Sequence, residues 1–128
     1  MRSILLLGGG GHCRSCIDVI EATEHFRIKG VVDAKKSSDC IFGYPVVGSD
    51  HDLPKLLKGP SLVLITVGQI KTPETRIRLF DLLKRLDADL PVVISPTAYC
   101  SKYSVVGKGS IIMHGAIINS GAQIGKNC

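Results

Sequence analysis

The stretch that decides the fold is ISPTAYCSKYSVVGKGSIIMHGAIINSGAQIGKNC, residues 94–128. An aliphatic residue or cysteine recurs at every sixth position, and a small residue follows four positions after each. The first set is Ile94, Cys100, Val106, Ile112, Ile118 and Ile124, and the second is Ala98, Ser104, Ser110, Ala116, Ala122 and Cys128. Neither a helix nor a flat strand has this period. A triangular coil of short parallel strands does, with six-residue sides and the aliphatic residue inside the prism.

These 35 residues make just under two turns of such a coil. A solenoid buries its core by stacking neighbouring coils, and roughly three or more repeats are usually needed. We therefore expect the chain to be a truncated piece of a longer protein. The other interpretation is a short chain that covers its open end by association.

Residues 1–93 predict a small parallel α/β domain, because buried strands alternate with helical segments. The first strand is expected over Ser3–Leu7 and the first helix from His12 to about Glu24. The second strand is expected over Ile28–Asp33. Gly43–Gly48 is predicted as an irregular edge segment, because Pro45 cannot donate to a ladder.

The rest of this domain continues the alternation. Ser49 or Asp50 is expected to cap a short helix, and Ser61–Val67 reads as a strand buried on both faces. Thr72 is predicted to cap a second helix with Pro73 at its first position. In that helix Ile77, Phe80 and Leu83 are expected to face inward, and Arg76, Lys84 and Arg85 to lie nearer solvent. A final strand, Pro91–Ile94, leads into the coil.

A ligand site is predicted where the carboxyl ends of the parallel strands meet. The loop Gly8–Gly11 opens a helix whose N-terminal N–H groups favour phosphate, although Gly8, Gly10 and Cys13 match a dinucleotide fingerprint imperfectly. Asp33 ends the second strand, where an acid can accept hydrogen bonds from a ribose. The predicted substrate-binding residues are Gly8, Gly9, Gly10, Gly11, His12, Asp33, Gly68, Gln69, Lys71 and Arg76.

Two kinds of side chain supplement the glycine loop in this prediction. His12 can donate to or accept from a ligand, and it titrates near physiological pH. Lys71 and Arg76 can meet a diphosphate, although an ordinary basic loop and helix face would look the same.

The composition narrows the function. The net charge of +5 fits a phosphate-bearing ligand, but no basic stripe interleaved with aromatic residues points to nucleic acid. No apolar run has transmembrane length and no export signal is recognisable, so a cytoplasmic protein without a membrane partner is expected.

The five cysteines show no spacing typical of a disulfide framework, which fits a reducing compartment. Cys13 and Cys16 form a CxxC at a helix start, where a redox pair is conceivable. The glycine loop favours a phosphate site instead. Zinc lacks a second ligand pair, so no metal is predicted.

His114 is the one histidine within the coil segment, at a position expected to be a corner. Gly115 follows it, so no adjacent carboxylate orients the ring. We do not expect it to be a catalytic base.

The combination of LLLGGGGHCRSCIDVIE (5–21), FGYPVVGSDHDL (42–53), ITVGQIKTPETRIRLF (65–80) and the repeats from ISPTA onward resembles one family. It is the bacterial sugar acetyltransferases of the sialic-acid O-acetyltransferase and UDP-amino-sugar N-acetyltransferase group. The resemblance covers the whole chain. It implies a Rossmann-like acceptor domain over residues 1–93 and the first one to two coils of a left-handed β-helix over residues 94–128.

The resemblance also implies the chemistry. Acetyl-CoA is the co-substrate, the complete protein is a homotrimer, and a histidine general base activates a sugar or nucleotide-sugar acceptor. Gly8–His12, Asp33, Gly68 and Gln69 correspond to the acceptor pocket. The family's catalytic histidine falls beyond Cys128, so no catalytic residue is expected in this chain, and the 128 residues alone should be inactive.

Two other functions stay open at this stage. One is a nucleotide or nucleotide-sugar binding module without catalysis. The other is an NAD-linked oxidoreductase. The imperfect glycine fingerprint and the lack of room for a substrate domain count against this interpretation.

Overall fold

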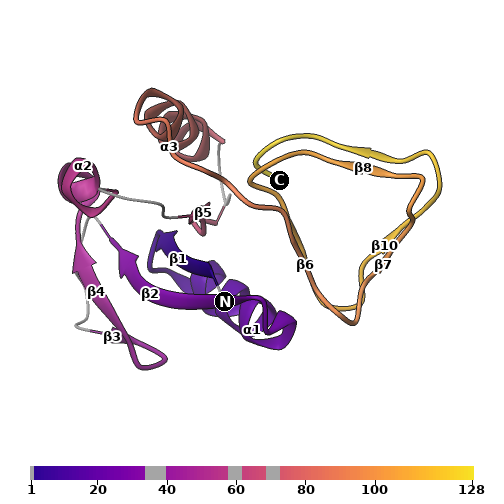
Figure 1. The fold of residues 1–128 in the computed structure, drawn as a ribbon, viewed down its shortest axis with the longest axis horizontal. Helices are drawn as coiled ribbons and strands as arrows, with labels where there is room; N and C mark the ends of the chain where they lie inside the picture. Colours follow the sequence, from indigo (N-terminus) through magenta and orange to yellow (C-terminus); the bar gives the residue numbers. More distant parts are fainter. Residues whose placement is uncertain (1, 34–39, 58–61, 69–72) are drawn as a thin grey trace.

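The structure, a computed structural model, describes residues 2–33, 40–57, 62–68 and 73–128. Figure 1 shows an α/β part beside a triangular coil of chain. We call the first the sheet lobe (residues 2–92) and the second the prism (residues 93–128). Within the described ranges, none of the helices is long and apolar enough to cross a bilayer.

The sheet lobe is built on a five-stranded sheet in the order β3-β4-β2-β1-β5. The strands are β1 (Arg2–Leu7), β2 (Phe26–Val32), β3 (Cys40–Ile41), β4 (Tyr44–Gly48) and β5 (Leu62–Ile65). β1 pairs in parallel with both β2 and β5, and β2 pairs in parallel with β4. Only β3 runs antiparallel. The predicted parallel α/β domain is confirmed.

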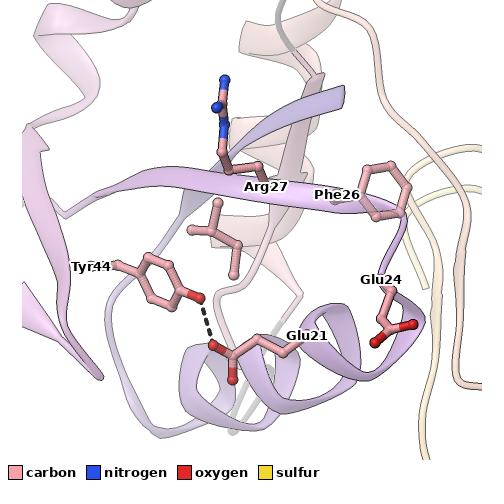
Figure 2. Close-up of a pocket in the computed structure, with 6 residues that line it drawn as sticks. Glu21, Glu24, Phe26, Arg27 and Tyr44 are labelled. Atoms are coloured by element: carbon pink, nitrogen blue, oxygen red, sulfur yellow. Dashed lines mark hydrogen bonds between the residues drawn. The ribbon is translucent and has the colours of Figure 1, made fainter. Parts of the chain in front are cut away.

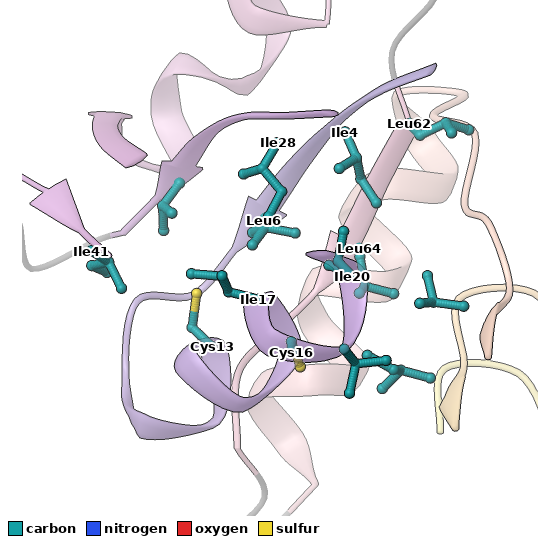
Figure 3. Packing of buried hydrophobic residues seen from close by; sticks show 14 residues of the cluster. Ile4, Leu6, Cys13, Cys16, Ile17, Ile20, Ile28, Ile41, Leu62 and Leu64 are labelled. Carbon is teal, nitrogen blue, oxygen red and sulfur yellow. The ribbon is translucent and has the colours of Figure 1, made fainter. Parts of the chain in front are cut away.

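Helices cover both faces of this sheet (Figure 1). α1 (Gly11–Thr23) packs Cys13, Cys16, Ile17 and Ile20 against one face, as Figure 3 shows. The 3₁₀ turn η1 (Asp50–Asp52) leads into the short helix α2 (Leu53–Leu56), which covers the other face with α3 (Glu74–Arg85). β1 is apolar from Ile4 to Leu7 because it is buried from both sides.

Residues 44–48 correct one prediction, because they form strand β4 between β3 and β2 rather than an edge segment, although its pairing with β2 has a register shift between Val31 and Val32. β4 pairs with β2 through Val31–Val46 and Val32–Gly48, so this pairing does not need the N–H that Pro45 lacks. The sheet therefore extends one parallel strand further than expected. This places the carboxyl end of β4 beside that of β2.

The orientation of α3 corrects a second prediction. Its inward stripe is Arg76, Leu79 and Leu83, with i, i+3, i+7 spacing. Ile77, expected to face inward, is 54% exposed, whereas Arg76, expected near solvent, is 7% exposed. Pro73 is the N-cap residue rather than the first helical residue, and Thr72 lies outside the described residues.

The prism consists of six two-residue strands that begin six residues apart. They are β6 (Val93–Ile94), β7 (Tyr99–Cys100), β8 (Val105–Val106), β9 (Ile111–Ile112), β10 (Ile117–Ile118) and β11 (Gln123–Ile124). Each pairs in parallel with the strand eighteen residues away: β6 with β9, β7 with β10 and β8 with β11. Three sides thus repeat over two coils, as the spacing of six predicts (Figure 1).

The prism adjoins the sheet lobe along α1. Val93 and Ile111 are buried in the same apolar cluster as the inner face of α1, and Met113 packs against it. The predicted strand Pro91–Ile94 is therefore reduced to Val93–Ile94, which pairs within the prism rather than joining the lobe's sheet.

Candidate functional site

The glycine loop is held against the ends of three strands. Gly8 adopts φ +124°, its N–H donates to Val32 O at 2.8 Å, and its carbonyl accepts from the buried Thr66 hydroxyl at 2.7 Å. A Cβ on Gly8 would lie 2.5 Å from Val67 Cγ2. Position 8 therefore needs glycine for its backbone conformation and for space.

The N-terminus of α1 opens at this loop without a side-chain cap. Gly10 is the N-cap residue, no side chain bonds the first turn, and the turn contains no acidic residue. A Cβ built on Gly10 or Gly11 would meet nothing within 4 Å. The positive end of a 13-residue helix that has no side-chain cap favours an anion here.

Asp33 lies directly after β2, next to the glycine loop. Its N–H donates to Gly48 O at 3.0 Å, which ties it to the end of β4. Its Oδ2 would be only 2.6 Å from a Cβ on Gly9, so the carboxylate packs over that glycine. The carboxylate of Asp33 and the glycine loop are thus brought together at the carboxyl ends of the strands, as the sequence pattern predicts.

His12 occupies the first turn of α1, next to Gly68. A Cβ built on Gly68 would lie 3.4 Å from the His12 Cβ. Partial burial lowers the pKa of His12 from 6.5, and the positive charge of Arg76 lowers it further. The ring is therefore neutral near pH 7, with one nitrogen able to donate and the other able to accept.

A cavity of about 660 Å³ joins these features and has the size of a small-molecule site. Of the predicted residues, it is lined by Gly8, Gly9, Gly10, Gly11, His12, Asp33 and Gly68. Gln69 and Lys71 lie outside the described residues.

Sequence reasoning missed four other residues that line the cavity. They are Asp50, Thr75, Arg78 and Leu79, and Arg78 Nη1 lies 3.4 Å from Asp50 Oδ2. A signal for Asp50 existed, because it follows β4, whose carboxyl end is at the same sheet edge. It was hidden by the prediction that 43–48 is irregular.

These features agree with one protein family. The profile of the PglD N-terminal domain matches residues 3–83. The chain belongs to the PglD N-terminal domain family. No match is found among curated protein sequences.

Solved structures extend the PglD-type likeness into the prism. The acetyltransferase domain of PglB from Neisseria gonorrhoeae FA1090, in complex with acetyl coenzyme A, is 25% identical with a TM-score of 0.87. The match covers 98% of this chain and 60% of that one. The chain thus spans about three fifths of that relative's length.

Two structures from Caulobacter crescentus agree with this. A histidine-to-asparagine mutant of perosamine N-acetyltransferase, in complex with CoA and GDP-perosamine, is 29% identical with a TM-score of 0.88. There the match covers 99% of this chain and 59% of that one. PerB, with the same two ligands, is 26% identical with a TM-score of 0.78, and the match covers 100% of this chain and 65% of that one.

Arg76 holds the PglD-type lobe to the prism rather than lining the cavity. Its guanidinium donates to Val67 O at 2.8 Å, to Asn127 O at 3.0 Å and to Asn127 Oδ1 at 2.8 Å. It does not line the cavity, and its positive charge contributes to the lowered pKa of His12. The structure gives no support to direct contact between Arg76 and a ligand.

The CxxC pair is part of the core. Cys13 and Cys16 are both fully buried, and burial raises the pKa of each thiol, that of Cys16 to about 12. Thiolate chemistry needs an accessible, low-pKa sulfur, so these residues serve as packing. Among the described residues, no three His, Cys, Asp or Glu side chains gather as metal ligands would.

A second, more open hollow of about 460 Å³ lies between the end of α1 and strands β2 and β4 (Figure 2). Glu21, Phe26, Arg27 and Tyr44 are among its lining residues, and the Tyr44 hydroxyl donates to Glu21. It contains none of the predicted site residues.

Proposed function

We propose that this chain is the acceptor-binding part of an acetyl-CoA-dependent sugar acetyltransferase, and that its cavity takes a nucleotide-linked sugar. The observation that supports this most directly is the uncapped N-terminus of α1, which opens into the cavity beside Asp33. A sugar nucleotide carries a diphosphate next to a ribose. The cavity offers an anion site next to a ribose acceptor.

The cavity walls suit the two ends of such a ligand. The glycine backbone and α1 bind the diphosphate, and the Asp33 carboxylate accepts from the ribose hydroxyls. Asp50 and Arg78 give the opposite wall an acceptor and a donor, which suit the polar edge of a base or sugar.

The acetyl transfer proposed here is a property of the whole protein. These 128 residues match about three fifths of the length of each relative. The acceptor nucleophile attacks the thioester carbonyl of acetyl-CoA, a histidine base takes its proton, and the C–S bond breaks to release CoA. An amine acceptor is supported by the likeness to perosamine N-acetyltransferase. Acetyl-CoA as the acetyl donor is supported by the acetyl coenzyme A and CoA named for the relatives.

Exposed apolar residues on the prism support the expected homotrimer. Tyr99 and Ile117 are neighbours in the β7–β10 pair and are 62% and 69% exposed, and Val105 on the next side is 62% exposed. We infer that these sides contact other copies of the chain. Sedimentation of a longer protein as a monomer would contradict this.

Calorimetric titration tests the acceptor proposal. UDP, GDP and CMP should be compared with a free nine-carbon sugar acid. We expect a nucleoside diphosphate to bind one site per chain, and Asp33→Asn to weaken its binding about 10- to 150-fold, because a hydrogen bond to a charged group contributes about 1.5–3 kcal/mol.

Glu24→Gln is the matched control, since Glu24 is an exposed acid away from the cavity and should leave affinity unchanged. Binding of the free sugar acid alone would favour the sialic-acid branch of the family. Binding of neither class would refute the proposal.

A further inference from the structure

His114 is the centre of a hydrogen-bonded cluster at a corner of the prism, outside the cavity. Its Nδ1 lies 2.6 Å from Ser95 Oγ and 3.2 Å from Thr97 Oγ1, and its Nε2 lies 3.0 Å from Asp18 Oδ2. Gly115 gives the ring no neighbouring carboxylate in the sequence, but α1 supplies one from 96 residues away.

Backbone N–H groups donate to both hydroxyl oxygens of the cluster. Gly115 N–H donates to Thr97 Oγ1 at 3.2 Å, and Thr97 N–H donates to Ser95 Oγ at 3.1 Å. An ionised carboxylate can only accept, so Nε2 carries a proton and donates to Asp18. In the tautomer protonated at Nε2 alone, Nδ1 accepts from the Ser95 hydroxyl.

Serine, histidine and aspartate are bonded here in the order found in the catalytic triad of hydrolases. The serine is too deeply buried, however, to attack a substrate. Ser95 is 1% exposed, and its oxygen already accepts the Thr97 N–H. A nucleophile must reach its substrate, so the cluster does not form a hydrolase site.

The cluster instead joins the two parts of the molecule. Asp18 lies on α1, whereas Ser95, Thr97 and His114 lie on the prism. α1 begins at Gly11 beside the cavity, and Asp18 is about two turns further along, at 1.5 Å per residue. The helix that presents its N-terminus to the ligand is therefore the one bonded to the prism corner.

The apolar contact between α1 and the prism lacks this directionality. Val93 and Ile111 are buried there, and such burial is largely indifferent to small rotations. Hydrogen bonds weaken steeply when misaligned. Arg76–Asn127 is a second polar contact, made from α3, so two separated contacts define one orientation of lobe and prism.

We propose that Asp18 and His114 are a positioning pair that fixes the orientation of the sheet lobe, and with it the acceptor cavity, relative to the prism. Their importance for acetyl transfer rests on the proposed function, because acceptor and acetyl donor must meet at a set geometry. Their effect on the orientation of the lobe does not depend on the proposed function.

Residual dipolar couplings of the 128-residue chain test the orientation directly. In the unaltered chain, couplings from the sheet lobe and from the prism should fit one alignment tensor. His114→Ala and Asp18→Ala should each lose this common fit, with a weaker alignment of the prism. The double variant should be no worse than either single one, since the two residues form one interaction.

Two amide substitutions separate positioning from local packing. Gln carries an N–H group far enough from the backbone to reach Asp18, whereas Asn can satisfy only the Ser95 side. His114→Gln should restore the common tensor and His114→Asn should not. His25→Ala, an exposed histidine in the loop after α1, should leave the common tensor intact.

The nucleotide affinity of each variant is measured in parallel. It should be unchanged, because neither residue lines the cavity. Separate tensors in the unaltered chain, one tensor in His114→Ala, or equal rescue by Asn and Gln would each overturn the positioning role. If the unaltered chain binds no nucleotide, only the acceptor proposal is refuted.

Discussion

At the scale of the residue, the four glycines of the loop have different tasks. Gly8 is required because its φ is positive and Val67 occupies the space of a side chain, and a Cβ on Gly9 would displace the side chains of Asp33 and Ile41, whereas Gly10 and Gly11 have open space around them. The run of glycines looks uniform in the sequence. Only the contacts distinguish those that hold the loop from those that leave the helix end open.

The first prediction follows from this difference. Gly8→Ala should lower the free energy of unfolding by about 2–4 kcal/mol and abolish nucleotide binding, because its φ is positive and its Cβ would meet Val67. Gly11→Ala should be neutral or stabilise by up to about 1 kcal/mol, since it lies in a helix with open space. Urea unfolding measures both, and equal effects would contradict the contacts.

The second prediction concerns His12. Its pKa is below 6.5 in the folded chain, so the unfolded state binds the proton more readily. Stability should therefore fall as the pH drops below about 6.5, until the folded-state pKa is reached. His12→Gln should remove this contribution. A midpoint above 6.5 for His12 in an NMR titration would show that the sign is wrong.

At the scale of the element, α1 combines three functions on one helix. Its N-terminus opens into the cavity, its apolar face packs on the sheet with Cys13 and Cys16, and Asp18 bonds the prism. A motif such as CxxC therefore has to be judged by the face of the helix on which it lies. Here that face is the core.

The third prediction follows from the burial of that face. In the native chain, iodoacetamide should modify the exposed Cys40 and Cys128 first and leave Cys13 and Cys16 unmodified. The Cys16 pKa of about 12 also keeps it a thiol through pH 9. Mass spectrometry after unfolding in urea should find all five cysteines reactive. Rapid native labelling of Cys16 would contradict the packing.

At the scale of the whole molecule, polar contacts join parts of the chain that are distant in sequence. Arg76 reaches Asn127 across 51 residues, and Asp18 reaches His114 across 96. The apolar contact through Val93 lies between them in the same interface. The sheet lobe and the prism thus pack against each other and are not two independent domains joined by a flexible linker.

The fourth prediction tests this coupling. Arg76→Ala should destabilise the chain by about 3 kcal/mol, because it leaves the carbonyls of Val67 and Asn127 without their donor. Arg85→Ala, at an exposed position of the same helix, should change stability by less than about 0.5 kcal/mol. Urea unfolding followed by prism and lobe signals separately should show both parts affected. An effect confined to α3 would contradict the coupling.

The sequence by itself determined the two-part architecture. A spacing of six repeated along residues 94–128 suits only a three-sided coil, because each side pairs with the same side of the next turn. Strand and helix patterns likewise determined a parallel sheet. The topology of such a sheet then brought Asp33 to the glycine loop without any further information.

Only the tertiary structure decided what the side chains of α3 and the prism corner contact. Helical periodicity allowed Arg76 to face solvent, and it faces inward because Asn127 and Val67 supply acceptors there. Asp50 joined the cavity because β4 pairs with β2, and His114 gained a carboxylate because α1 lies against its corner. Such contacts depend on how separate elements pack, and packing leaves no local pattern in the chain.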